Sequence, residues 1–169
     1  MCCIIYKPKG VRMPSLDTLA KIKKLNHNGY GFVSTGHFHK GLDYRTFLRH
    51  LSEVGDDEDC IIHFRLATQG SICRSNCHPF EKDGVYFAHN GVLRTLPVND
   101  MTDSEIVFRY QIYPDVIQRY GYGTKQADWA IRQICGNSSR FAMMYQGEVR
   151  LYGDYKIVDG VYYSNLRWL

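Results

Sequence analysis

The C-terminal third of the chain constrains the fold most, because it predicts consecutive antiparallel strands. Three runs rich in β-branched and aromatic residues are RFAMMY (140–145), EVRLYG (148–153) and YKIVDGVYYS (155–164). The first two are separated by Gln146-Gly147, and the third is divided by Asp159-Gly160. A glycine-containing pair between two apolar runs is typical of a tight hairpin turn. We therefore expect at least one antiparallel sheet.

Shorter apolar runs earlier in the chain predict further strands at 3–6, 32–36, 60–64 and 85–89. Amphipathic stretches between them predict helices. These begin after Ser15, after Asp43 (closing at Gly55), at about 104, at Pro114 and after Thr124 (closing at Gly136). Pro114 is expected to start a new helix over 114–120, because proline is tolerated in a first turn. We expect one α+β or layered α/β domain over residues 1–169.

The composition of the chain indicates which kinds of partner it can bind and in which cell compartment it is expected. The net charge of +4 is mild and the basic residues are scattered, so no nucleic-acid partner is expected. No run approaches the ~20 apolar residues of a membrane span, and CCIIY is too short for a signal-peptide core. These features predict a cytoplasmic protein with reduced thiols. Its six cysteines are then a nucleophile, metal ligands or small buried residues rather than a disulfide framework.

Two motifs lie in or beside the glycine-, serine- and asparagine-rich stretch 67–83, a loop long enough to suggest function. In HFRLATQG (63–70), Arg65 ends a predicted strand and suits either a carboxylate ligand or a structural ion pair. In SNCHPF (75–80), His78 fits a general base, a metal ligand or a loop anchor.

A zinc site is a further possibility, because the spacing of Cys and His resembles a ligand set. Its candidate ligands are Cys60, His63, Cys73, Cys77 and His78. Strand alternation argues against it, since Cys60 and His63 should point to opposite faces.

Two more motifs each allow a structural and a functional interpretation. Asn90-Gly91, in AHNGVL, is typical of a hairpin turn, but it also suits an oxyanion hole. Asp103, in DMTDSEIVF, suits a helix N-cap or a ligand for an amino group. At the N-terminus, removal of Met1 would give Cys2 a thiol and a free α-amino group on one residue.

Taken in order, these segments resemble a known family. Cys2 followed by NHNGYG, HFRLATQG, SNCHPF, AHNG and TDSE is similar to the motif order of the class II glutamine amidotransferases. The closing DGVYYSN (159–165) resembles that of short, stand-alone relatives from phage and bacterial genomes. The resemblance implies an N-terminal-nucleophile (Ntn) hydrolase, built as a four-layer αββα sandwich, and a host-cytoplasm location if the chain is phage-encoded.

The resemblance also implies roles for individual residues. Cys2, after loss of Met1, would attack the side-chain amide of glutamine with its own α-amino group as base, forming a thioester and releasing ammonia. Asn90 and the Gly91 N–H would form the oxyanion hole. Arg65 would bind the substrate α-carboxylate and Asp103 its α-ammonium group. The rest of the substrate pocket would comprise Leu66, Thr68, Gln69 and His78. No metal or cofactor is implied.

Three departures bear on activity. Cys3 stands where the family keeps glycine, Leu66 replaces a tryptophan and Gln69 replaces a histidine. They keep an alternative open, a catalytically altered Ntn-fold module that binds a ligand or a protein. We expect no second, ammonia-consuming domain in these 169 residues, so an acceptor would belong to a separate synthetase partner.

Overall fold

The computed structural model describes all residues, 1–169, and shows an α+β chain with two antiparallel sheets. The strands are β1 (Cys3–Lys7), β2 (Tyr30–Ser34), β3 (Phe38–Gly41), β4 (Cys60–Phe64), β5 (Phe80–Lys82), β6 (Val85–Asn90), β7 (Arg140–Tyr145), β8 (Glu148–Tyr152), β9 (Lys156–Val158) and β10 (Val161–Tyr163). The helical segments are α1 (Leu16–Leu25), α2 (Tyr44–Leu51), α3 (Asp103–Val107), the π-helical η1 (Phe108–Ile117), α4 (Gln118–Tyr120) and α5 (Lys125–Cys135). The predicted α+β class is confirmed.

Every pair of neighbouring strands is antiparallel. One sheet has the order β3-β2-β4-β1-β10-β9, and the other has the order β5-β6-β7-β8. The predicted turns at Gln146-Gly147 and Asp159-Gly160 are confirmed, with positive φ at both residues of each pair, as tight hairpins require. Because β8 and β9 belong to different sheets, the C-terminal tail crosses from one sheet to the other.

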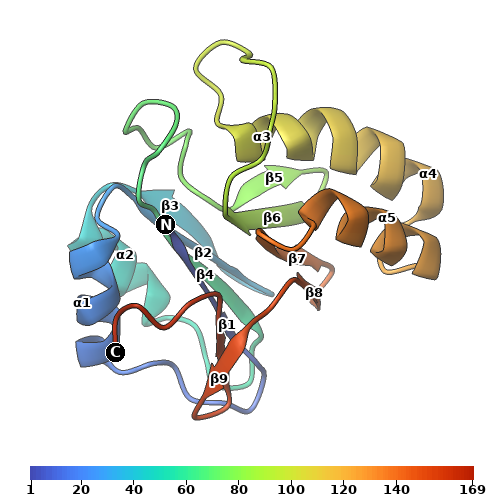
Figure 1. Ribbon diagram of the computed structural model, residues 1–169. Helices are drawn as coiled ribbons and strands as arrows, with labels where there is room; N and C mark the ends of the chain where they lie inside the picture. Colours follow the sequence, from blue (N-terminus) through green and yellow to red (C-terminus); the bar gives the residue numbers. More distant parts are fainter.

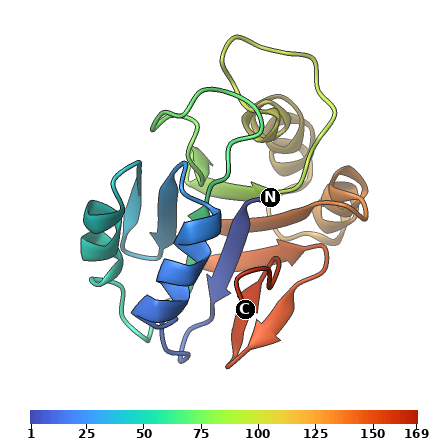
Figure 2. The ribbon, with the colours of Figure 1, turned by 60° about the vertical axis from the view of Figure 1, so that its left-hand side comes forward.

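The two sheets pack face to face with helices outside each, which gives four layers (Figure 1). Alternation along β1 shows how: Cys3 and Ile5 enter the core beneath α1 and α2, whereas Ile4 points toward the other sheet. The buried core between the two sheets is formed largely by small and medium-sized side chains, including Ala88 and Ala142. Figure 2, turned by 60°, again shows α1 and α2 on one side and the yellow and orange helices on the other. No helix combines the length and apolar character needed to cross a bilayer.

The capping residues were predicted well and one helix end was not. The side chains of Ser15, Asp43 and Thr124 accept hydrogen bonds from the first turns of α1, α2 and α5, and Gly136 follows α5. Helix α2 ends at Leu51, before the predicted Gly55. After it the chain tightens into i→i−3 hydrogen bonds, such as that from Val54 N–H to the Leu51 carbonyl.

The expectation that Pro114 starts a new helix was wrong. Residues 103–120 form one continuous helical segment, and Pro114 lies inside its π-helical part. In a regular α-helix the proline ring would clash with the carbonyl four residues earlier. A wider π turn relieves this clash, so the helix continues past the proline.

Candidate active site

A small cleft of about 30 Å³ lies where the N-terminus meets two long loops, 65–79 and 91–102. Both loops rise above the N-terminus in Figures 1 and 2. The cleft is lined by Cys2, Arg65, Leu66, Thr68, Gln69, His78, His89, Gly91, Thr102, Asp103 and Ser104. Of the predicted site residues, only Asn90 is absent from this lining. Residues from distant parts of the sequence therefore converge on the Cys2 thiol.

Cys2 is held by its neighbour on the first loop. Its Sγ accepts a hydrogen bond from the Leu66 N–H at 3.3 Å and lies 3.5 Å from the Leu66 carbonyl oxygen. Burial raises the pKa of the Cys2 thiol above its ordinary value, and the hydrogen bond from Leu66 opposes this effect. A thiol in this environment needs a base to become a nucleophile near neutral pH.

Cys3 does not compete for the cleft. It is fully buried in the core under α1 and α2, on the face of β1 opposite Ile4. Burial raises the pKa of the Cys3 thiol to about 12, so Cys3 remains an inert thiol. The residue that stands in place of the family's glycine thus fills core volume rather than the pocket.

Arg65 is almost fully buried, and its guanidinium donates to main-chain carbonyls of the loop that follows it. Nη1 bonds the Ser71 oxygen and Nη2 the Gln69 oxygen, each at 2.9 Å. The structure shows no ion pair to Arg65. Arg65 therefore fixes the shape of this loop while lining the cleft, and its role as a carboxylate ligand stays a prediction.

Asp103 is the first residue of α3 rather than its cap. Thr102 is the N-cap, and its hydroxyl accepts from the Glu105 N–H. The Asp103 carboxylate instead accepts from the N–H groups of Leu93 and Ser104, both at 2.8 Å. It thereby ties the second loop to the helix while facing the cleft.

Asn90 and Gly91 do not form a hairpin turn, since the chain continues from β6 into the loop 91–102. Asn90 is buried, its Nδ2 lies 2.9 Å from Ser164 Oγ, and its Oδ1 has no hydrogen-bond partner. Gly91 has φ +142°, and a Cβ there would lie 2.9 Å from His89 Nε2 and 2.5 Å from Ser139 Oγ. Only glycine fits this conformation and space.

Three buried histidines lie beside the cleft: the sequence suggested roles for His78 and, as a zinc ligand, for His63, but none for His89. The rings of His63 and His78 stack with centroids 4.0 Å apart, and His63 Nε2 lies 3.1 Å from the His89 carbonyl oxygen. Both ring nitrogens of His78 lack a partner. Burial lowers the pKa of all three, to about 3 for His63, to about 4 for His89 and well below the ordinary value for His78. They are therefore neutral at physiological pH.

The zinc alternative has no support in the structure. Cys60 lies in the core beneath the helices, whereas His63 points between the sheets, as strand alternation predicts. No three His, Cys, Asp or Glu side chains come together in a way that could hold a metal ion. All six cysteines are free thiols.

Comparison with known proteins gives one family match. Residues 54–135 match the family of class II glutamine amidotransferases, a stretch that includes all of the cleft residues except Cys2. The match covers just under half of the chain and supports the assignment of a class II glutamine amidotransferase domain. No curated protein matches the sequence.

Proposed function

We propose that this chain hydrolyses the side-chain amide of glutamine with Cys2 as an N-terminal nucleophile after removal of Met1, in an Ntn-hydrolase fold. The convergence of Cys2 with Arg65, Gly91 and Asp103 on one cleft carries the proposal. The family match supports a class II glutamine amidotransferase-like function for the domain as a whole.

In the first half of the reaction, the α-amino group of Cys2 takes the thiol proton. An unperturbed α-amino group has a pKa of roughly 7.7–8.0, so a useful fraction is neutral near pH 7.5. The sulfur attacks the amide carbon, and the carbonyl oxygen becomes an oxyanion that accepts from Asn90 Nδ2 and the Gly91 N–H. The amine then passes its proton to the leaving nitrogen, the C–N bond breaks, ammonia departs and a thioester remains.

In the second half, water attacks the thioester and the same amine takes a proton from it. The C–S bond breaks, glutamate leaves and the thiol is regenerated with that proton. All three buried histidines are neutral, so none of them supplies the positive charge of an imidazolium in either half.

Substrate binding requires the two loops to move. The cleft volume is on the order of one water molecule, far less than a glutamine needs. We propose that the substrate α-carboxylate replaces the loop carbonyls on Arg65, since carboxylate is the stronger partner for its planar fork. The α-ammonium group would bind Asp103, and Thr68, Gln69, Leu66 and His78 would line the rest of the pocket.

We propose that the ammonia passes to an acceptor on a separate synthetase partner. The free thiols fit a reducing compartment such as the cytoplasm.

The test is ammonia release from L-glutamine by wild type and Cys2→Ala, with Cys135→Ala as the control. Cys135 is a buried free thiol in the other half of the molecule. We expect Cys2→Ala to lose activity completely and the control to retain it. A glutamine-like diazoketone should modify Cys2 alone, as peptide mass spectrometry would show. Equal ammonia release by wild type and Cys2→Ala would refute the proposal.

A second candidate is a ligand-binding module on the same fold, without turnover. The pKa of the Cys2 thiol, raised by burial, favours it, because a protonated thiol is a poor nucleophile while the pocket around it could still hold a ligand. Calorimetry that detects glutamine binding to wild type, together with absence of ammonia release, would select this function.

A further inference from the structure

Ser164 and Asn165, directly after β10, enclose the first residues of the chain. Ser164 N–H donates to the Ile4 carbonyl at 2.9 Å, and Ile4 N–H donates to Ser164 Oγ at 2.8 Å. Asn165 Nδ2 donates to the Cys2 carbonyl at 2.8 Å. Because β1 begins at Cys3, Cys2 itself lies outside the pairing of the sheet. The bond from Asn165 therefore holds the Cys2 main chain where the strand does not.

The same serine contacts the predicted oxyanion donor. Ser164 is buried, its Oγ lies 2.9 Å from Asn90 Nδ2, and Asn90 Oδ1 has no partner. If the amide of Asn90 turns by 180°, the Ser164 hydroxyl donates to Oδ1 and still accepts from Ile4 N–H. In this orientation Asn90 Oδ1 accepts a hydrogen bond from Ser164, and Nδ2 takes the position that Oδ1 occupies, without a partner, in the structure. Asn90 then has a free donor.

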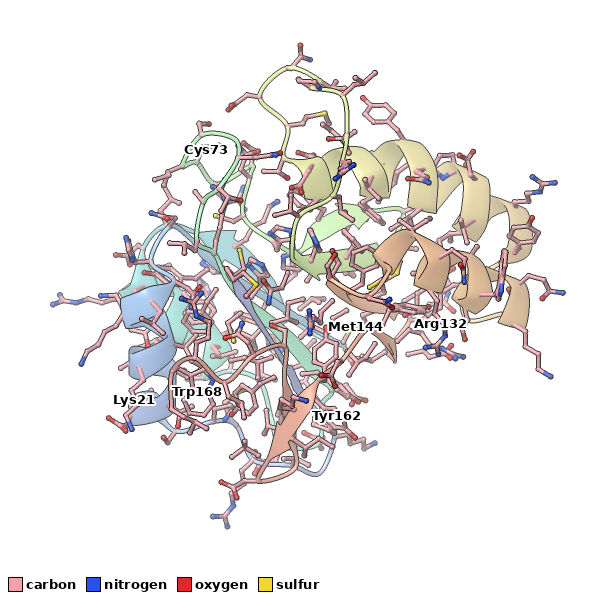
Figure 3. All side chains as sticks on the ribbon, viewed as in Figure 1. Lys21, Cys73, Arg132, Met144, Tyr162 and Trp168 are labelled. Carbon is pink, nitrogen blue, oxygen red and sulfur yellow. The ribbon has the colours of Figure 1, made fainter.

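The segment that follows anchors the pair in the core. Trp168 Nε1 donates to the Asn165 carbonyl at 3.2 Å, and Asn165 Oδ1 accepts from Arg167 N–H at 3.3 Å. Trp168 is 9% exposed, and its ring packs on that of Tyr163 with centroids 5.0 Å apart. Figure 3 shows Trp168 beside α1, on the helix-covered side of the larger sheet. A packed indole thus fixes the Asn165 backbone.

We propose that Ser164 and Asn165 are positioning residues for the amide hydrolysis, an inference that rests on the proposed function. Asn165 holds the Cys2 carbonyl and so sets the direction of the α-amino group that acts as base. Ser164 orients the Asn90 amide so that Nδ2 faces the oxyanion. Neither side chain touches the substrate, and both act through Cys2 and Asn90.

Steady-state ammonia release by the Ser164→Ala and Asn165→Ala variants tests the proposal. The matched controls are Ser138→Ala and Asn137→Ala, which change a serine and an asparagine at exposed positions. Loss of an oxyanion donor typically costs ~10²–10³ in rate, so we expect Ser164→Ala to lower kcat by at least about tenfold with KM nearly unchanged. Ser164→Thr, which keeps the hydroxyl, should recover part of the loss. Asn165→Ala should lower kcat and shift the acid limb of its pH profile, because the base is displaced.

A second readout separates this inference from the proposed function. Cys2 alkylation by iodoacetamide, followed by mass spectrometry across pH, needs no glutamine turnover. If wild type releases no ammonia, the proposed function fails, but slower alkylation of Asn165→Ala than of Asn137→Ala still supports positioning. Equal alkylation rates in these two variants would overturn it.

If wild type is active and both Ser164→Ala and Asn165→Ala keep wild-type kcat and pH profile, the function stands and the positioning role is refuted. Thermal unfolding checks that each variant folds. Should Asn165→Ala fail to fold, Asn165→Asp keeps the shape and removes the donor, so wild-type kcat in that variant would equally refute the role.

Discussion

Lowering the pH from 7.5 to 5 should destabilise the protein by about 4 kcal/mol or more, because three histidines are buried in neutral form. His63, His78 and His89 are at most 4% exposed. Burial lowers their pKa in the folded state relative to the ordinary value of 6.5. Between these values the unfolded chain binds protons that the folded chain excludes, so the free energy of unfolding falls as the pH falls.

The magnitude follows from the two histidines with defined values. At pH 5 an unfolded histidine of pKa 6.5 is almost fully protonated, whereas His63 and His89, with pKa values of about 3 and 4, remain mostly neutral. A gap of about 1.5 pH units at ~1.36 kcal/mol per unit gives about 2 kcal/mol for each. His78 contributes in the same direction. Against a typical total of about 5–15 kcal/mol, this loss is large.

Urea denaturation at pH 7.5 and pH 5 measures the effect. His63→Gln should lose less stability than wild type between the two pH values, by about 2 kcal/mol. His27→Gln, at an exposed position, should lose as much as wild type. A wild-type free energy of unfolding that is the same at pH 7.5 and pH 5 would refute the argument that these histidines are buried and neutral.

Three substitutions test other parts of the structure. Cys3→Gly should lower the free energy of unfolding by about 2 kcal/mol, because it removes a buried side chain and raises the conformational entropy of the unfolded chain. Diazoketone labelling of Cys2 should remain intact, and loss of labelling in folded protein would contradict the placement of Cys3 in the core. Gly91→Ala should lower the free energy of unfolding by at least about 1–3 kcal/mol and also lower kcat, because the added Cβ would lie 3.0 Å from Ser139 Cα. A variant with wild-type stability and kcat would show that the backbone can adapt. Lys7→Met should lower the free energy of unfolding by about 2–4 kcal/mol, because the buried Lys7 Nζ donates hydrogen bonds to three main-chain carbonyls of residues 55–58. An unchanged midpoint in urea denaturation would count against that network.

Local signals in the sequence predicted most of the fold. Helix caps such as Ser15 and Thr124 bond to backbone N–H groups a few residues away, and the turn at Asp159-Gly160 depends on the φ angles of those two residues. The local sequence is therefore enough to predict these features. Pro114 was misassigned because a π-helical segment accommodates it, and that depends on packing rather than on local preference. Asn90-Gly91 has the composition of a hairpin, but here it lies where the chain leaves the sheet for a long loop.

The site was predicted to the extent that its residues fall in recognisable motifs. The sequence could not show that Arg65 donates to its own loop, because such contacts depend on loop conformation. The stack of His63 on His78 joins a strand to a loop 15 positions away, which periodicity does not reveal. Likewise, Asn165 reaches Cys2 only because β10 pairs with β1 in the folded sheet.

The central claim is that Cys2 reacts only as the N-terminal residue, and one preparation can test it. The chain is produced with a short leader that a site-specific protease removes to expose Cys2, and ammonia release from L-glutamine is measured before and after cleavage, with intact mass verified at both points. We expect no release before cleavage and saturable release afterwards, because the free α-amino group is the base. Equal release from the uncleaved and cleaved protein would contradict the N-terminal nucleophile mechanism.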